Sequence, residues 1–358
     1  MWRKVFVVIF SVWAGFTAWP AHAEEETHRV RMMTYNIRYG WGAAGVKDSL
    51  DLARIARVIN EKSPDLVALQ EVDVGMKRTD GVDQAIALGE MTGLTAVFGV
   101  AHDYSNDGVM GNAVLTRFPV TGYLNHHYPL EPVVNPEHIR FYGRSFLEVR
   151  VRVGTQILTI YSTHWPHLGV QQYDRFNAGS ILRCAEDRLH LPLIAAGDLN
   201  TRPYWDEFPP LLDFLFDPFE ANAGGDFTAP AESPFQRIDF VLHNGDSRLS
   251  YRPGSYLILN DARTRWASDH LPVVTEYDLE MAPRNGDERP CSESILVDKR
   301  RTPPGDGTYQ TPWVTVAAAV EAASPGTLVG IHAETYYEPQ TIGKDLCLCT
   351  YGGLTKID

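Results

Sequence analysis

The chain has little cysteine, no long run of basic residues and no long apolar segment after its first two dozen residues. Four cysteines in 358 residues are too few for a disulfide scaffold, and no Cys-x-x-Cys spacing indicates a structural zinc site. Lys and Arg number 32 against 45 Asp and Glu, a formal net charge of −13. Because general polyanion binders carry clustered cations, this balance argues against a broad nucleic-acid-binding protein, although a nuclease with bound metal ions stays compatible with it.

The four cysteines are compatible with one disulfide bond. Cys347 and Cys349 lie two residues apart in a strand-like run, so they share a face and are not expected to bond each other. A bond from Cys291 to either of them is compatible with the sequence. Cys184 falls in a helical pattern and is expected to pack as a small apolar side chain.

The one long apolar run lies at the N-terminus and has the pattern of a secretory signal peptide over residues 1–23. Arg3 and Lys4 precede an uncharged stretch at 5–19, and the small-x-small sequence AHA at 21–23 offers a cleavage site. A short membrane anchor is the alternative, but the run is short for a transmembrane span. We therefore expect a soluble mature protein that is secreted or periplasmic.

The body of the chain alternates strand and helix signals, with 44% hydrophobic residues, which excludes a collagen, a coiled coil or a mostly disordered chain. Tight turns such as Gly154 imply antiparallel pairs, and helical crossovers imply parallel ones. The pattern predicts a mixed-sheet α/β domain over residues 24–280. Strands are expected at 29–37, 66–69, 95–100, 112–116, 144–153, 156–162, 191–196, 238–242 and 271–277, and helices at about 50–62, 83–92 and 172–189.

Composition changes after residue 280. Residues 281–305 hold four prolines, mixed charge and little periodicity, which is typical of a linker. Residues 306–358 then show a small-residue helix at 315–324 and strand patterns at 327–333 and 341–350. The sequence thus predicts a signal peptide, one large domain, a linker and a short C-terminal segment.

Polar side chains follow or flank the apolar strands in six places. The residues concerned are Asn, Asp, Glu, Gln and His, placed at Asn36, Gln70-Glu71, His164, Asp198 to Asn200, Asp239 and Asp269-His270. Ligands bind α/β proteins where loops leave the strand ends. Carboxylate oxygens hold Mg²⁺, which takes its remaining ligands from water and substrate, and histidine supplies a base near neutral pH. The set therefore suits a hard cation and a phosphate.

At these positions the chain resembles the endonuclease/exonuclease/phosphatase superfamily. The matching stretches occur in the family's order over roughly residues 29–280. They are MTYNIR (33–38), PDLVALQEVD (64–73), GNAVLTRFP (111–119), YSTH (161–164), AAGDLN (195–200), RIDFVL (237–242) and SDHLPV (268–273). The resemblance implies an α/β fold in which two mixed β-sheets, flanked by helices, form a four-layer sandwich. It also implies metal-dependent cleavage of phosphate esters.

The resemblance assigns roles to the motif residues. Glu71 would be the main ligand of Mg²⁺, with Mn²⁺ as an alternative, and Asn36 and Asp269 would hold the metal or its waters. Asp239 would orient His270, which would activate water or bind the phosphate, and Asp198 is a second candidate for positioning the water. The phosphate would also meet the side chains of Asn200 and His164. Each has a structural alternative, such as an Asx turn at Asp198 and Asn200.

Two further phosphate contacts are weaker candidates. Tyr104 lies where some relatives place a phosphate-contacting tyrosine, although the surrounding AHDYSND matches poorly. Arg144 precedes a strand and could clamp the phosphate, or it could be a surface arginine. The histidine pairs His126-His127 and His164 with His167 fit no common zinc spacing and are expected to be loop residues.

The sequence leaves the substrate open between classes. The stretch QEVDVGMKRTDGVDQ (70–84) resembles bacterial metal-dependent hydrolases related to sphingomyelinases and deoxyribonucleases. The acidic charge and the export signal favour a small or lipid phosphodiester over DNA or RNA. Trp165, Tyr204 and Trp205 could contact a lipid headgroup or membrane surface, and Lys77, Arg78 and Arg202 a phosphate. A non-catalytic binding protein is less compatible with the intact polar set, and no protein partner is expected.

The C-terminal segment carries a second resemblance. Residues 305–339 (GDGTYQTPWVTVAAAVEAASPGTLVGIHAETYYEP) resemble the cap and first coil of a right-handed parallel β-helix, as in pectate-lyase-like proteins. Solenoids need about three repeats to bury a continuous core, and this segment offers one or two. We therefore expect a partial β-helix-like unit without lyase activity.

Overall fold

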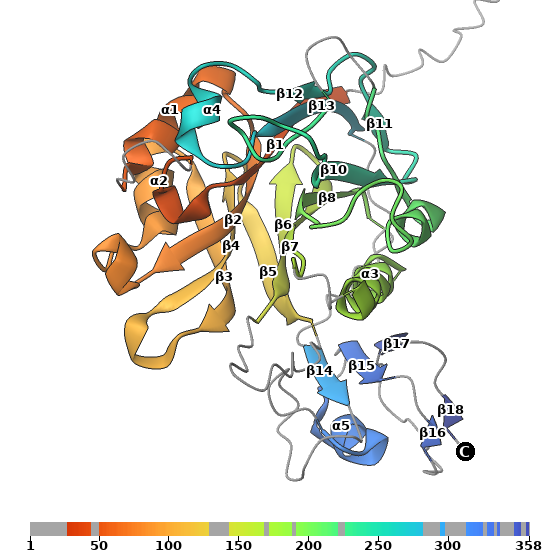
Figure 1. Ribbon diagram of the computed structural model, residues 1–358. Coiled ribbons are helices and arrows are strands. Elements are labelled where there is room, and N and C mark those ends of the chain that lie inside the picture. The colour runs from red at the N-terminus through yellow and green to blue at the C-terminus, as the bar shows by residue number, and fades with distance from the viewer. Residues whose placement is uncertain are drawn as a thin grey trace, which may run out of the picture.

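Two β-sheets lie face to face in the large domain, with helices on their outer sides (Figure 1). The computed structural model describes residues 27–43, 50–128, 143–167, 172–187, 191–220, 226–281, 294–297, 313–324, 328–332, 335–336, 347–351 and 356–357. The expected α/β four-layer sandwich is confirmed. The predicted signal peptide, the disulfide of Cys291 and most of the predicted linker lie outside the described residues.

The first sheet holds seven strands in the order β11-β13-β1-β2-β4-β3, with β12 beside β13. β1 and β2 are parallel because α1 connects them, and the other pairs are antiparallel. Helices α1, α2 and α4 cover its outer face (Figure 1). The bounds are β1 (Thr27–Asn36), α1 (Leu52–Lys62), β2 (Leu66–Val74), α2 (Gln84–Thr92), β3 (Thr95–Asp103), β4 (Val109–Thr116), β11 (Leu249–Tyr251), β12 (Leu257–Ile258), α4 (Thr264–Ala267) and β13 (Val273–Glu280).

The second sheet holds six strands in the order β5-β6-β7-β8-β10-β9, with β7 and β8 parallel across the connecting helix α3. The sequence pattern did not predict its edge strand β5, which alternates half-buried and exposed positions and lacks an apolar run. The bounds are β5 (Val120–His127), β6 (Ser145–Val153), β7 (Gln156–His164), α3 (Gln172–Asp187), β8 (Leu193–Asp198), β9 (Leu215–Phe216) and β10 (Asp239–Asn244). Short 3₁₀ turns occur at Arg38–Gly40, Lys77–Thr79, Ser105–Asp107 and Pro209–Asp213.

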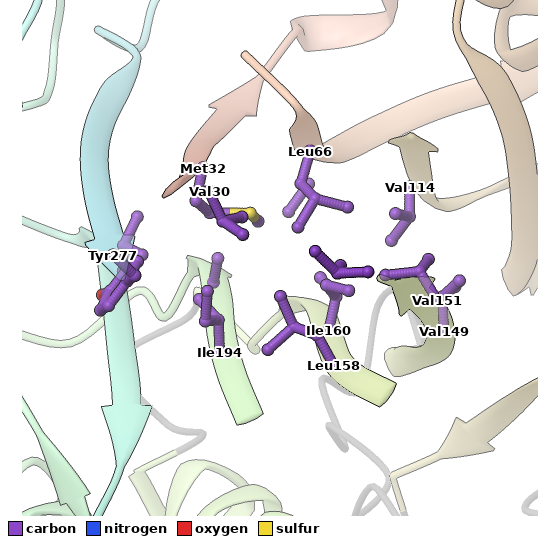
Figure 2. Packing of buried hydrophobic residues seen from close by; sticks show 14 of the residues in the cluster. Val30, Met32, Leu66, Val114, Val149, Val151, Leu158, Ile160, Ile194 and Tyr277 are labelled. Carbon is purple, nitrogen blue, oxygen red and sulfur yellow. The ribbon is translucent and has the colours of Figure 1, made fainter. Parts of the chain in front are cut away.

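Three apolar layers separate the four structural layers. Side chains alternate along each strand, so β1 sends Val30 and Met32 into the layer between the sheets and Met33 and Tyr35 under the helices. Figure 2 shows the layer between the sheets, where Val30, Met32 and Leu66 face Leu158, Ile160 and Ile194. A third layer packs α3 on the second sheet. Strands buried on both faces explain the nearly continuous apolar runs in the sequence.

Side-chain caps fix the ends of the helices on the first sheet. Asp51 Oδ1 accepts a hydrogen bond from Arg54 N at 3.1 Å and so begins α1. Asp83 begins α2 in the same way. The left-handed residue Ser63, followed by Pro64, ends α1 as its sequence predicts.

The C-terminal part contains a small parallel sheet of β14 (Ser294–Val297), β15 (Leu328–His332) and β17 (Cys347–Tyr351). Helix α5 (Val316–Ala322) packs Val316, Ala319 and Val320 against it, and β16 (Thr335–Tyr336) pairs with β18 (Lys356–Ile357). β14 lies inside the expected linker, because the apolar run SILV pairs with β15. Among the residues described, none of the helices has the length and apolar character needed to cross a membrane.

Candidate active site

Three of the predicted site residues form one row across the second sheet. His164 on β7 lies opposite Asp198 on β8, and Asp198 lies opposite Asp239 on β10. Residues in register on neighbouring strands point to the same face, with Cβ atoms about 5 Å apart. All three side chains are buried, the most exposed at 4%. The strand register therefore assembles an imidazole and two carboxylates from separate motifs.

His270 joins this row from the loop before β13. Its Nδ1 donates to Asp239 Oδ2 at 2.9 Å, which is the predicted contact, and its Nε2 lies 3.8 Å from Asp198 Oδ2. The Nε2 atom of His164 lies 3.3 Å from the same oxygen. Two imidazoles thus converge on one oxygen of Asp198, and one of them is oriented by a second carboxylate.

Burial and charge shift the pKa values of this group. Burial raises the pKa of Asp198 to about 7, helped by the charge of Asp239 and opposed by that of His270. Burial alone would lower the pKa of His270, but Asp239 and Asp198 outweigh it and raise this pKa well above its ordinary value. Asp198 can therefore exchange a proton near neutral pH beside a charged imidazole, as general acid–base catalysis requires.

His164 is neutral, and its contacts fix its tautomer. Burial, and then the charge of Arg144, hold the pKa of His164 well below its ordinary value. Arg144 Nη1 lies 3.3 Å from His164 Nδ1, and a guanidinium only donates, so Nδ1 accepts. The proton of the neutral ring consequently sits on Nε2, which faces Asp198. This ring can donate a hydrogen bond to a phosphate oxygen, in the role that the sequence predicts for it.

A β-bulge aims Glu71 into the site. The pairing of β2 with β4 shifts register between Leu69 and Val72, and Glu71 has a left-handed φ of 55°. A bulge turns its side chain away from regular alternation, and such bulges are common beside active sites. Asn36 Nδ2 donates to Glu71 Oε1 at 3.4 Å and to Asp198 Oδ2 at 3.1 Å. Asn36 therefore connects the Glu71 side of the site with the histidine side.

Asp269 lies on the Glu71 side. Burial raises the pKa of Glu71, and the charge of Asp269 raises it further. Arg38 Nε approaches Asp269 Oδ2 at 3.4 Å, and Ser268 Oγ donates to the backbone oxygen of Asn36 at 2.8 Å, which ties the loop to the end of β1. The two carboxylates repel each other, and a divalent cation between them would relieve that repulsion, so this donor set fits a hard metal ion.

Comparisons with known proteins agree with this architecture. Residues 33–270 match the model of the Endonuclease/Exonuclease/phosphatase family. The chain belongs to this family. Among solved structures, it resembles an endonuclease/exonuclease/phosphatase from Beutenbergia cavernae at 27% identity and a TM-score of 0.55, over 70% of this chain and 72% of that one. It also resembles the Bacteroides thetaiotaomicron mannosyl-6-phosphatase at 18% identity and a TM-score of 0.53, over 69% and 99% of the two chains. No curated protein matches the chain.

Family members generally depend on a divalent metal, and the chain offers two places for one. Asp198, Asp239 and His270 place their ligand atoms within 4.8 Å of one another, the one such group of three or more within the described part of the chain. In this group, however, both oxygens of Asp239 already face His270 Nδ1, at 3.1 and 2.9 Å. Within the described residues, no histidine hydrogen-bonds the carboxylates of Glu71 and Asp269, although Arg38 approaches Asp269, so these two fit a metal better. His126 and His127 lie at the end of strand β5 and not in the expected loop, because they pair with Phe146 and Ser145 on β6.

The structure places the remaining candidates unevenly. Asn200, with a left-handed φ of 46°, donates its side-chain amide to Trp165 O at 3.0 Å, and its backbone N–H bonds Asp198 Oδ1 at 3.0 Å. The Asx turn considered as the alternative therefore exists beside the site. Tyr104 lies edge-on to His102 with the ring centroids 4.4 Å apart, and the guanidinium carbon of Arg78 lies 5.6 Å from the centroid of its ring. Trp165, expected at a surface, is 0% exposed and packs in the core of the second sheet.

The site contains residues that sequence reasoning left without a role. Arg144 is buried, and its Nη2 lies 3.1 Å from His167 Nδ1, so the expected loop histidine takes part in the site. Arg38 contacts Asp269, and its place two residues after Asn36 in MTYNIR was the available signal. The three cations that were candidates for a phosphate contact bind neighbouring side chains. Lys77 pairs with Asp107 and Arg78 pairs with Asp73. Arg202 donates to Tyr204 and Gln236.

Proposed function

We propose that this family member is an exported, Mg²⁺-dependent phosphodiesterase that hydrolyses small or lipid phosphodiesters. The observation that carries the proposal is the convergence of His270 and His164 on Asp198, with Asp239 orienting His270. A phosphodiester needs a proton acceptor for the attacking water and donors for its developing negative charge, and this group supplies both.

The chain's own residues divide the work as follows. Asp198 accepts the proton of the water that attacks phosphorus, the bond to the departing ester oxygen breaks, and the charged His270 supplies the proton that this oxygen takes up. Asp239 keeps His270 in one orientation and favours its charged form. His164 donates Nε2–H to a non-bridging phosphate oxygen, and Arg144 fixes that tautomer. Asn200 lies beside this group, since its backbone N–H bonds Asp198 Oδ1.

Glu71 and Asp269, with Asn36 beside them, would hold the metal, which stabilises negative charge on the phosphate and the departing oxygen when it is bound. Asn36 contributes in a second way, since its amide holds Glu71 and Asp198 at a fixed spacing. Mn²⁺ offers the same oxygen preference and should substitute.

Two features of the sequence support the proposed substrate class and cellular location of the protein, its net charge and its N-terminal segment. The net charge of −13 disfavours long polyanions, and residues 1–23 have the pattern of an export signal. Tyr204 is 73% exposed next to the site loop and could contact a lipid headgroup. DNA or RNA is the alternative substrate that the same site would serve.

The test measures hydrolysis by the mature chain with Mg²⁺, using bis(4-nitrophenyl) phosphate, sphingomyelin vesicles and supercoiled plasmid. Release of 4-nitrophenol or phosphocholine that disappears in His270→Ala supports the proposal. If the protein nicks the plasmid, His270→Ala abolishes the nicking, and sphingomyelin is not cleaved, the substrate is a nucleic acid and not a lipid. Folded, Mg²⁺-binding protein that cleaves none of the three would contradict the proposed activity.

A further inference from the structure

Three consecutive residues after β1 adopt left-handed backbone conformations. Arg38, Tyr39 and Gly40 have φ values of 45°, 42° and 77°. Glycine takes such angles without strain, but arginine and tyrosine do so rarely, and consecutive L-residues hardly ever form a left-handed turn. Strain of this kind persists where the surrounding structure enforces it, and it concentrates at functional sites.

The surroundings do enforce this turn. Gly40 N bonds Ile37 O at 2.8 Å and Trp41 N bonds Arg38 O at 2.9 Å, which closes the turn. The buried side chain of Gln84 donates to Tyr39 O at 2.7 Å and accepts from the backbone N of Asp73 at 3.0 Å. The turn is therefore clamped to the bulged strand that carries Glu71.

The clamped turn puts the Tyr39 ring against a fixed cation. The guanidinium carbon of Arg78 lies over the ring, 4.0 Å from its centroid. Arg78 is itself held by two bonds of 2.7 Å to the buried carboxylate of Asp73. A cation fixed in this way on one face of an aromatic ring also fixes the plane of the ring. The side chain of Tyr39 is half-buried, so part of the ring stays open to solvent.

The turn that carries the Tyr39 ring lies on the metal side of the site. Burial raises the pKa of Tyr39, and the charge of Glu71 raises it further, with a smaller effect in the same direction from Asp269. Gln84 also ties this turn to the strand of Glu71, since it bonds Tyr39 O and the backbone N of Asp73, two residues after Glu71. Arg38, the other strained residue, reaches Asp269 from the same turn.

We infer that Tyr39 forms a substrate-binding wall beside Glu71 and Asp269, against which a ring-bearing ester group of the substrate packs. The inference rests on the proposed function and narrows its substrate class to phosphoesters that carry a planar ring next to the phosphate. A rigid ring suits this task because it loses little conformational entropy when a second ring stacks on it. An alkyl group offers less flat surface to the same wall.

The test compares phenyl phosphate with ethyl phosphate as ligands of the Mg²⁺-loaded mature chain, by calorimetric titration. Both carry the same phosphate, so their affinity ratio reports the ring. We expect roughly three- to tenfold tighter binding of phenyl phosphate, the range typical of one aromatic contact. Tyr39→Phe should keep this preference, because it keeps the ring, whereas Tyr39→Gly and Tyr39→Ala should abolish it.

The Gly and Ala variants separate a binding role from a structural one. Both remove the ring, but only glycine relieves the strained φ, so Tyr39→Gly should melt at a higher temperature than Tyr39→Ala. Ser63, an exposed residue with a φ of 46° at the end of α1, is the matched control. Ser63→Gly and Ser63→Ala should differ in melting temperature in the same direction without any change in the ligand preference.

The outcomes also distinguish this inference from the proposed function. If the wild type shows no preference for phenyl phosphate, or if Tyr39→Gly keeps that preference, the binding wall is overturned. Any measured hydrolysis would still support the proposed function. If the preference for phenyl phosphate follows the melting temperature across the variants, the binding wall is overturned as well, because the Tyr39 ring would then act only by stabilising the fold. A chain that shows the preference but cleaves no phosphodiester would refute the proposed activity and keep the binding wall.

Discussion

Single residues in this site owe their properties to burial rather than to their type. Asp198 and Asp239 occupy equivalent positions on neighbouring strands, yet burial and its neighbours raise the pKa of Asp198 to about 7. Asp239 instead faces His270 Nδ1 with both oxygens and stabilises the charged imidazole. The two aspartates therefore take different roles in the site.

Replacing Asp239 by Asn should show this division. Asp239→Asn keeps the shape but removes the charge that raises the pKa of His270, so this pKa should fall when the imidazole is titrated by NMR. Loss of such an orienting carboxylate commonly costs about 10–100-fold in activity. Asp246→Asn, after β10 and away from the row, is the control. An unchanged pKa of His270 would contradict the pairing.

His127 on β5 should make the fold sensitive to acid. Burial, with the charge of His126, lowers the pKa of His127 to about 4, against about 6.5 in an unfolded chain. The unfolded state therefore binds the proton first, so the stability contribution is full above pH 6.5 and is lost as the pH falls toward 4.

We expect His127 to account for about 2 kcal/mol of the decrease in unfolding free energy between pH 7 and pH 5. Urea denaturation at the two pH values measures it. His127→Gln, which cannot be protonated, should show a correspondingly smaller decrease. An equal decrease in both proteins would mean that other groups cause the acid sensitivity.

At the scale of elements, the site depends on how closely β7 and β8 approach. A Cβ atom built on Gly197 would lie 1.9 Å from the backbone oxygen of Thr163. Gly197→Ala should therefore push the strands apart and destabilise the protein by about 3 kcal/mol. It should also lower activity by about 100-fold, because it displaces Asp198 relative to His164.

Gly179 on α3 gives the matched control. Its added Cβ would meet Trp165 at 3.5 Å and Leu211 at 3.6 Å, which is ordinary contact. Gly179→Ala should raise the unfolding free energy by about 0.5–1 kcal/mol, because alanine favours a helix. Thermal melting and hydrolysis rates of both variants test this prediction. If Gly197→Ala lowered neither stability nor activity, the close approach of β7 and β8 would be refuted.

The sequence predicted the elements unequally. Strands with apolar runs, such as β2 and β8, were expected in the right places because burial on both faces demands such runs. β5 was missed because it is an edge strand without one. The bulge at Glu71 was also not predictable, since a register shift depends on the partner strand β4.

At the scale of the whole molecule, a bound metal should stabilise the fold. A ligand that binds only the native state adds about 2.7 kcal/mol at a hundred times its dissociation constant. The melting temperature should therefore rise with Mg²⁺ or Mn²⁺. Glu71→Gln should largely remove this rise, whereas Glu90→Gln, an exposed carboxylate on α2, should keep it. A rise of equal size in Glu71→Gln, with loss in Asp239→Asn, would move the metal to the histidine row.

Apolar periodicity and the motifs at strand ends are local properties, so they were enough to predict the family, the two-sheet architecture and most polar members of the site. Which of these groups meet depends on contacts between distant segments of the folded chain. The register of β7, β8 and β10 aligned His164, Asp198 and Asp239, and burial then set their pKa values. The strained Tyr39 and its Arg78 partner likewise follow from contacts between distant segments, which no local pattern encodes.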